Sequence, residues 1–351
     1  MAVLSYKCPN CGGELMFDPE SQQFKCEYCV SHFTQAELDK LNPDASSEES
    51  IVEEQDDGVK EEVVLYTCPS CGAEIVTDST TAATFCYYCH NPVVLSGRIS
   101  GEFLPDSVIP FVIDKEVATN KFMEFVQKKK FIPTNFFNKK QIEKISGVYF
   151  PYWLYDCKLD SSVSATATTV KTWRQGNVQY TEKKTYRIDR SGDVELKDIY
   201  KNALQKNNSK LAEGVFPYDM SGEKNFHMGY LSGFLAEKRD IEKEVLEESV
   251  RNEAKRYSKE ILMDTVKGYS SVVPKGERHV FQGERWRYTL LPVWTVTYPG
   301  KDGKTYFYSM NGQTGSVVGE LPVDKKKVFT FGALMGFATF VITMLGGWLI
   351  W

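Results

Sequence analysis

Cys8-Pro9-Asn10-Cys11 and Cys26-Glu27-Tyr28-Cys29 form a pattern that the chain repeats 60 residues later. Both copies read Cys-x2-Cys-x14-Cys-x2-Cys. A tetrahedral zinc ion takes four thiolates at about 2.3 Å, and two Cys-x-x-Cys turns joined by a short hairpin supply that ligand set. The pattern predicts two zinc ribbons, each with a structural four-cysteine site. The predicted ligands are Cys8, Cys11, Cys26, Cys29, Cys68, Cys71, Cys86 and Cys89.

Disulfides and haem attachment are the competing interpretations of these cysteines. Residues 1–6 do not resemble a signal peptide, which favours a reducing compartment over one that forms disulfides. Cys86-Tyr87-Tyr88-Cys89-His90 also matches the Cys-x-x-Cys-His pattern of c-type haem attachment, but Val30 occupies the position of His90 in the first copy. The equal spacing of both copies therefore favours zinc, with His32 and His90 as flanking residues. A closed four-thiolate site is structural rather than catalytic, because it has no open coordination position.

The formal net charge of −5 conceals one strongly acidic segment. Residues 36–62 contain eleven Asp or Glu and two Lys, a net charge of −9. Such a sequence buries too little apolar surface to offset the entropy cost of ordering it. It predicts a disordered linker between a first ribbon at residues 1–35 and a second ribbon at residues 63–98, and an acidic interaction tail is the alternative.

Residues 99–322 predict an α+β domain of helices and β-hairpins. Apolar residues at helical spacing predict helices over 114–131 and 239–267. An apolar run predicts a buried strand over 147–156. Alternating residues predict strands over 158–173 and 178–190, joined by a hairpin turn at Gly176-Asn177. Further strands are predicted over 285–298 and 304–310. The segments Tyr149–Trp153 and Leu290–Trp294 share Pro-x-Trp, which predicts an internal duplication of residues 99–200 and 201–322. Two unrelated strands are the alternative.

The last 24 residues, 328–351, carry no charge. As a helix they would extend about 36 Å at about 1.5 Å per residue, which exceeds the roughly 30 Å hydrocarbon core of a bilayer. They predict a single transmembrane helix, since a buried core helix of this length normally shows a polar face. Lys325-Lys326-Lys327 directly precede it, so the positive-inside rule predicts a single-pass cell-membrane protein with cytoplasmic N-terminal domains.

Charge and motif content argue against nucleic-acid binding and catalysis. The first ribbon holds two Lys against four acidic residues, whereas phosphate binding depends on clustered Lys and Arg. The segment Gly300–Thr305 has two residues between its glycines, where a phosphate-binding loop needs four. The four histidines show no metal-ligand spacing. The sequence therefore predicts no enzymatic activity, identifies no small-molecule substrate and disfavours a nucleic-acid partner.

Three segments besides the Cys-Pro-x-Cys-Gly ribbons resemble a known family: Ile109–Lys115, Gly147–Trp153 and Gly229–Glu237. The family comprises bacterial, mainly Firmicute, membrane proteins with a zinc ribbon of the transcription-factor-IIB type, often mislabelled as primosomal helicase or replication proteins. The resemblance implies a non-enzymatic anchor in an envelope-stress system. Such an anchor holds a virion-core-like protein at the bilayer and, through it, a phage-shock-protein-A-like coat protein. It also implies metal ligation by the eight cysteines named above.

Together these features predict a tail-anchored scaffold that recruits partner proteins to the cytoplasmic face of the membrane, with the ribbons as docking modules. The alternative is a membrane-tethered nucleic-acid adaptor of the replication or transcription type. A zinc-dependent enzyme is a more distant alternative, which would need an open metal site or a cleft of perturbed carboxylates.

Overall fold

The computed structural model describes residues 6–41, 64–67, 74–77, 80–85, 92–95, 103–133, 145–205, 214–299 and 304–350. It is a mixed α/β chain that divides into two compact units. Unit 1 comprises Met1–Phe150, Lys206–Lys238 and Leu290–Trp351, and unit 2 comprises Pro151–Gln205 and Arg239–Thr289.

Unit 1 begins with a small antiparallel sheet of β1 (Leu15–Asp18), β2 (Gln23–Cys26) and β3 (His32–Phe33), followed by helix α1 (Gln35–Leu41). Leu15, Phe17 and Phe24 alternate with more exposed neighbours and form its buried face. Helix α1 covers residues that the sequence interpretation assigned to the start of the acidic linker. The remainder of that predicted linker, 42–62, lies outside the described residues.

The second cysteine copy contributes four strands: β4 (Val64–Thr67), β5 (Glu74–Thr77), β6 (Thr81–Phe85) and β7 (Pro92–Val94). Two pairings of the first copy recur at the same offset of 60 residues, whereas in the described part of the chain the β1–β2 pairing does not, because β5 pairs with β4 and β6 pairs with β7 and β12. Phe24 pairs with Phe33 in β2–β3, and Thr84 pairs with Val93 in β6–β7. Likewise, the bridge between residues 7 and 14 recurs between residues 67 and 74 of β4–β5. Cys68, Cys71, Cys86 and Cys89 themselves lie outside the described residues.

The rest of unit 1 packs strands and short helices around an aromatic core. Its further elements are β8 (Ser107–Val108), α2 (Lys115–Gln127), β11 (Lys224–Asn225), the 3-10 helices η5 (Met220–Gly222) and η6 (Met228–Leu231), β12 (Leu235–Glu237), β14 (Thr305–Asn311) and β15 (Val317–Glu320). Phe111 lies at the centre of the core. Its ring stacks on Phe234 at 4.2 Å and meets the ring edges of Tyr149 and Trp294.

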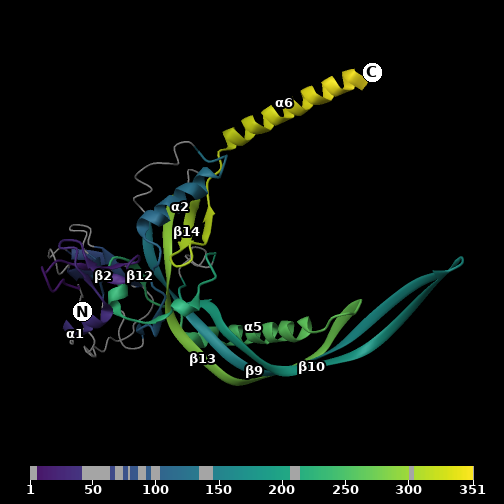
Figure 1. Cartoon of the computed structure of the whole chain (residues 1–351), viewed down its shortest axis with the longest axis horizontal. Helices are drawn as coiled ribbons and strands as arrows, with labels where there is room; N and C mark the ends of the chain where they lie inside the picture. Colours follow the sequence, from purple (N-terminus) through teal and green to yellow (C-terminus); the bar gives the residue numbers. More distant parts are fainter. Residues whose placement is uncertain are drawn as a thin grey trace. The chain divides into compact units, whose positions relative to one another are not determined.

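Unit 2 is built on the hairpin of β9 (Ser146–Gln175) and β10 (Val178–Asn202), which the turn at Gly176 joins. Helix α5 (Lys243–Asp264) lies along these strands and along β13 (Ser271–Pro299), as Figure 1 shows. Val250 and Ala254, one turn apart on α5, are fully buried against Tyr155 and Leu159 of β9. The predicted helix and hairpin are therefore present, and the strands are longer than the sequence patterns indicated.

The hairpins and helices are exchanged between the two sequence segments 99–200 and 201–322. In unit 1, α2 of the first segment packs on β14 of the second, with the rings of Phe122 and Tyr308 4.8 Å apart. In unit 2, α5 of the second segment packs on the β9–β10 hairpin of the first. Each helix therefore covers the hairpin of the other segment.

The two helix starts share a sequence and a set of contacts. Ile113-Asp-Lys-Glu-Val117 precedes or begins α2, and Ile241-Glu-Lys-Glu-Val245 does the same for α5. The indole N–H of Trp294 donates to the Ile113 carbonyl at 2.8 Å, and that of Trp153 donates to the Ile241 carbonyl at the same distance. Two residues before each isoleucine, the N–H of Phe111 donates to the Tyr149 hydroxyl, and that of Arg239 donates to the Tyr288 hydroxyl.

Arg239 takes the place in unit 2 that Phe111 holds in unit 1. Its guanidinium lies 5.1 Å from the Trp153 ring and 5.7 Å from the Tyr288 ring, is 4% exposed, and pairs with Glu242. We expect Arg239→Ala to lower the free energy of unfolding by about 2–4 kcal/mol, because the truncated side chain leaves a cavity and removes the cation–π contacts. Arg239→Phe supplies the ring found in unit 1 and should cost less than half as much. Urea unfolding measures both, and equal losses for the two variants would contradict the equivalence of these positions.

Helix α6 (Lys325–Ile350) ends the described chain. Its segment Lys325–Met344 has a mean hydropathy of 1.6, and none of this apolar stretch is buried against the rest of the protein. This helix is long and apolar enough to span a membrane, in agreement with the sequence prediction.

Candidate metal centre

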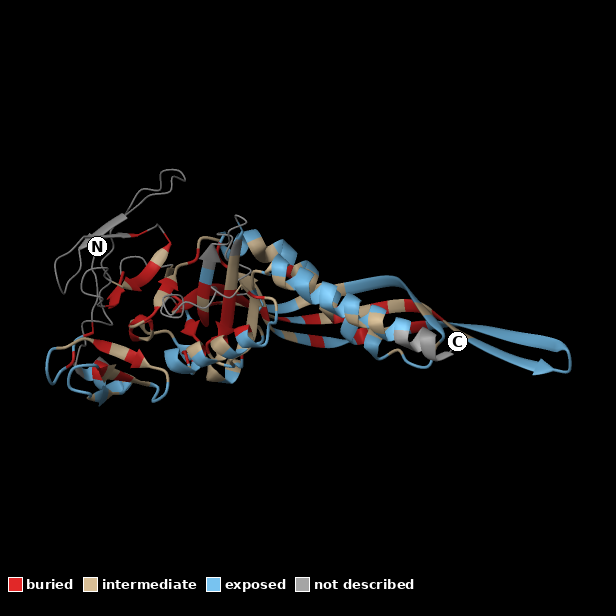
Figure 2. Cartoon of the chain, turned by 90° about the horizontal axis from the view of Figure 1, so that it is seen from above, coloured by how far each residue is buried: buried red, intermediate tan, exposed pale blue. Residues whose placement is uncertain are grey.

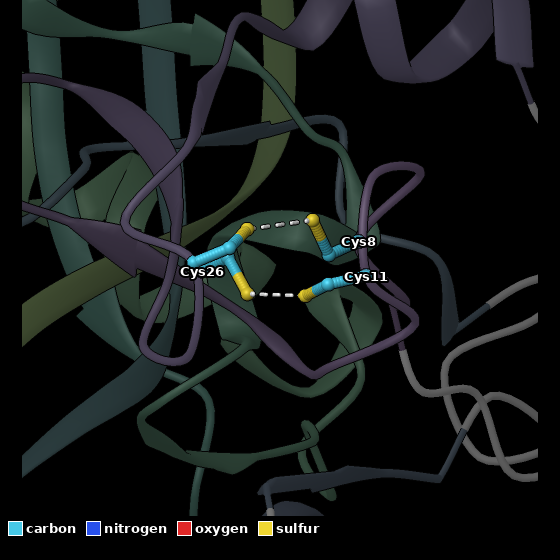
Figure 3. Close-up of side chains that lie close together, drawn as sticks. Cys8, Cys11 and Cys26 are labelled. Carbon is cyan, nitrogen blue, oxygen red and sulfur yellow. Dashed lines mark hydrogen bonds between the residues drawn. The ribbon is translucent and has the colours of Figure 1, made fainter.

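The first cysteine pattern brings four thiols together, as predicted. The Cys8 and Cys29 sulfur atoms lie 3.5 Å apart, as do those of Cys11 and Cys26, and all four sulfur atoms lie within 4.8 Å of one another. Figure 3 shows the labelled side chains converging from the two turns. A tetrahedral ion with bonds of about 2.3 Å separates its thiolates by about 3.8 Å. The cluster can therefore hold a metal ion with little movement.

The two Cys-x-x-Cys turns have the same backbone conformation. In each, the N–H of the residue after the second cysteine donates to the carbonyl of the first, Gly12 to Cys8 at 2.8 Å and Val30 to Cys26 at 2.9 Å. Both residues have positive φ, 72° at Gly12 and 60° at Val30. Glycine adopts this conformation freely, whereas for a β-branched residue it is strained. The geometry of the cysteine cluster thus holds the Val30 backbone at positive φ, although valine disfavours that conformation.

The four thiols differ in burial and in acidity. Cys8 and Cys26 are buried, and Cys11 and Cys29 are exposed. Hydrogen bonds from the hydroxyl and backbone N–H of Ser31 lower the pKa of Cys29 to about 6. A backbone hydrogen bond from Gly13 lowers the pKa of Cys11, but its hydrogen bonds with Cys29 and Cys26 outweigh that effect and raise it to about 12. The cluster therefore already stabilises a thiolate, which is the form that binds metals.

The first ribbon is docked on another part of unit 1. The Ser232 hydroxyl donates to the Leu15 carbonyl at 2.6 Å, and the Phe17 N–H donates to the Ser232 carbonyl at 3.1 Å. The rings of Phe17 and Phe24 both contact the Tyr230 ring, at 5.1 and 6.2 Å. The buried face of the first sheet is therefore held against η6 and the residues that follow it.

The segment Gly229–Glu237, which we call the ribbon-docking segment, also receives the second copy. Its strand β12 pairs with β6, with Ala236 opposite Ala83. The Thr80 hydroxyl donates to the Glu237 carboxylate at 2.6 Å. One short segment therefore binds strands from both cysteine copies. The sequence resemblance marked this segment, but nothing in its composition indicated what it contacts.

Gly229 allows the close approach of the first ribbon. A β-carbon at this position would lie 2.6 Å from the Phe24 ring and 2.9 Å from His227 Nδ1. We expect Gly229→Ala to destabilise the docked state by about 1–3 kcal/mol, because the added methyl group overpacks this contact. Hydrogen exchange should then be faster at the Phe17 N–H, while the metal content stays unchanged.

Gly283→Ala is the matched control, because nothing lies within 4 Å of a β-carbon at Gly283. Equal exchange rates at the Phe17 N–H in both variants would show that the ribbon does not dock through Gly229.

A serine–histidine arrangement in unit 2 was not evident from the sequence. The Ser258 hydroxyl donates to Ser161 Oγ at 2.6 Å, and His279 Nδ1 lies 3.0 Å from the same oxygen. Burial lowers the pKa of His279, which favours its neutral form. Both serines are fully buried, so no substrate can reach their hydroxyl groups. The contacts join α5, β9 and β13, and we assign them to packing.

A protein of Bacillus subtilis (strain 168) described as "Uncharacterized protein YdjG" is 32% identical to this chain over 350 residues. The alignment covers 98% of this chain and 99% of that protein. No family model matches the chain, and no solved structure matches it.

Proposed function

This chain belongs to the family of the Bacillus subtilis protein YdjG, and we propose that it is a membrane-anchored scaffold whose zinc ribbons dock partner proteins at the cytoplasmic face. The observation that carries the proposal is the uncovered apolar surface of α6. Its large exposed side chains are Val328, Phe329, Phe331, Leu334, Met335, Phe337, Phe340, Ile342 and Met344. A soluble monomer rarely exposes an apolar surface of this size to water, whereas the hydrocarbon core of a bilayer solvates it.

A group of lysines at the base of α6 supports a cytoplasmic orientation. Lys327 Nζ donates to the Ile132 carbonyl at 2.7 Å, and the rings of Phe131 and Phe331 are 5.4 Å apart. These contacts bring Lys128, Lys129 and Lys130 to the end of the helix that carries Lys325, Lys326 and Lys327. Six lysines beside a membrane helix favour the cytoplasmic leaflet, because its lipids are anionic and translocation of lysine is disfavoured.

We assign zinc to the four-cysteine cluster and a second zinc to the other copy. Four thiolates in tetrahedral arrangement are the ligand set of structural zinc, and the sulfur spacing of Cys8, Cys11, Cys26 and Cys29 fits it. The recurrence of the β2–β3 pairing in β6–β7 and of the 7–14 bridge in β4–β5, both at the 60-residue offset, supports a second four-cysteine site at Cys68, Cys71, Cys86 and Cys89. The ion would hold the two turns of each ribbon together and take no part in a reaction.

The exposed end of the first ribbon is the docking surface in this proposal. Tyr28 is 75% exposed and Val30 is 61% exposed, and both lie in the turn that carries Cys29. Apolar side chains on a rigid turn suit protein recognition, because little conformational entropy is lost on binding. The first ribbon is acidic, with two Lys against four Asp or Glu, which disfavours nucleic acid at this surface. The partners implied by the resemblance are the virion-core-like and phage-shock-protein-A-like proteins.

We also propose that residues 99–200 and 201–322 arose by duplication. The shared helix-start sequences at Ile113 and Ile241 and the equivalent tryptophan contacts support this origin.

A crosslinked pull-down from native membranes tests the docking role. The variant Tyr28→Ser/Val30→Asn removes the apolar surface and keeps the cysteines, and asparagine tolerates the positive φ at position 30. We expect it to lose a specific protein partner while its metal content and membrane attachment stay unchanged.

The matched control is Leu104→Ser/Val112→Asn, which removes two half-exposed apolar side chains elsewhere in unit 1. Equal recovery of all proteins by both variants would overturn the docking role of this turn. Recovery of nucleic acid that survives physiological salt, and that depends on Tyr28 and Val30, would support the adaptor instead.

A further inference from the structure

The β9–β10 hairpin extends beyond the part of unit 2 that α5 covers. Ala165, Ala167 and Ile188 are the last buried residues along it, and they pack against the end of α5 and the residues that follow. Every residue from 170 to 187 is exposed, and Figure 2 shows this end of the hairpin in pale blue. A two-stranded ribbon is only marginally stable in water. We therefore expect the exposed end of this hairpin to be stabilised by a binding partner.

The two faces of the exposed hairpin differ in chemistry. Trp173 pairs directly with Tyr180, so both side chains lie on one face, where their rings stack at 5.6 Å. Val178 and Tyr186 lie on the same face by strand alternation and pairing, and the Tyr186 ring contacts the Tyr269 ring at 5.6 Å. The opposite face carries Arg174, Lys183 and Arg187 among threonines. Lys171, Glu182 and Lys184 share the face of Trp173 and Tyr180, so the exposed end has its aromatic side chains on one face and basic side chains on both.

The charge of this ribbon selects among partners. Residues 170–187 contain five Lys or Arg and one Glu, a net charge of +4. A second copy of the hairpin would bring +4 against +4, which disfavours self-association. An anionic surface is favoured instead. Tryptophan and tyrosine prefer the bilayer interface, where the ring is in an apolar environment and its polar atom meets water.

We propose that the exposed end of the β9–β10 hairpin binds the anionic surface of a phospholipid bilayer. The hairpin enters the headgroup region by its tip, so that Trp173, Val178 and Tyr180 on one face lie among the headgroups and Arg174 and Lys183 on the other face contact lipid phosphates. The hairpin thus gives the protein a second membrane contact, separate in sequence from α6. This inference rests on the membrane anchoring proposed for α6 and is independent of the docking role of the ribbons.

Tryptophan quenching by brominated lipid tests the proposal on the full-length protein. The protein is reconstituted in vesicles of phosphatidylcholine alone and of phosphatidylcholine with an equal part of phosphatidylglycerol. The Trp173 contribution is the difference in fluorescence quenching between the unsubstituted protein and Trp173→Phe. Flotation of the vesicles shows separately whether the protein is anchored to them. We expect a Trp173 contribution in the mixed vesicles and a much weaker one in phosphatidylcholine alone.

Two charge variants separate the hairpin end from the rest of unit 2. Arg174→Glu/Lys183→Glu should weaken the Trp173 contribution at least about fivefold, since each basic residue near an anionic surface strengthens binding several-fold. Lys197→Glu/Lys243→Glu makes the same change of charge at exposed positions outside the hairpin end and should leave it unchanged. Trp173 and the four lysine or arginine positions are exposed, so we expect all variants to fold.

Each outcome decides the proposal. Equal quenching of the unsubstituted protein and Trp173→Phe, in vesicles that float with the protein, would overturn the hairpin contact and leave the anchoring intact. Protein that does not float with vesicles would overturn both. Quenching of Trp173 by an added single-stranded oligonucleotide, with none by brominated lipid, would replace the bilayer by nucleic acid as the partner.

Discussion

Replacing Cys8 and Cys26 with serine is expected to remove one zinc ion per chain and to unfold the first ribbon. Metal binding to a module of this kind contributes on the order of 10–16 kcal/mol, which exceeds what its few buried side chains can supply. Metal analysis should therefore give one zinc per chain in place of two. Hydrogen exchange should become fast at the N–H groups of β1 and β2, while α5 and β9 stay protected.

The loss should extend to the ribbon-docking segment. Tyr230 and Ser232 contact Phe17 and Leu15, so an unfolded ribbon leaves Gly229–Ser232 without its cover. Limited proteolysis should then cleave near η6. Cys157→Ser is the matched control, because Cys157 is a buried cysteine of unit 2 outside the cluster. A zinc content that is the same in Cys8→Ser/Cys26→Ser and in the unsubstituted protein would refute the assignment of the metal.

Arginine at Phe337 and Ile342 is expected to release the protein from membranes. Each arginine near the centre of a membrane helix costs about 2.5–3.5 kcal/mol on insertion scales. Together they would shift the partition by more than about a thousandfold, at about 1.4 kcal/mol for each factor of ten. After carbonate extraction, the unsubstituted protein should remain in the membrane pellet, and Phe337→Arg/Ile342→Arg should be soluble or degraded.

Val323→Arg is the matched control for this experiment. Val323 is 60% exposed and precedes α6, beside lysines that would already lie at the interface. An arginine there should leave the protein in the pellet. If Phe337→Arg/Ile342→Arg also stays in the pellet, then α6 does not anchor the chain.

The sequence by itself determined the features that depend on local spacing. The first four cysteines converge because a Cys-x-x-Cys turn fixes both sulfur positions within a few residues, and a short hairpin brings two such turns together. Helix α2 follows from apolar spacing and from Asp114, whose carboxylate accepts the Val117 N–H at 2.7 Å. The apolar part of α6 follows from composition alone, because no charged residue occurs after Lys327. The shared sequences at Ile113 and Ile241 were also available as a repeat signal, stronger than the Pro-x-Trp match.

Only the tertiary structure decided which of these elements meet. Each helix packs on the hairpin of the other segment, and both cysteine copies contact the ribbon-docking segment more than a hundred residues away in sequence. These contacts depend on complementary shape, such as the space that Gly229 leaves for the Phe24 ring. The periodicity of apolar residues along the sequence does not reveal such complementarity. The exposure of the free end of the β9–β10 hairpin is likewise a feature that only the tertiary structure decides. The alternation of the hairpin residues predicted strands, but only the packing of α5 and of the residues up to Ser270 determined that residues 171–185 are left uncovered.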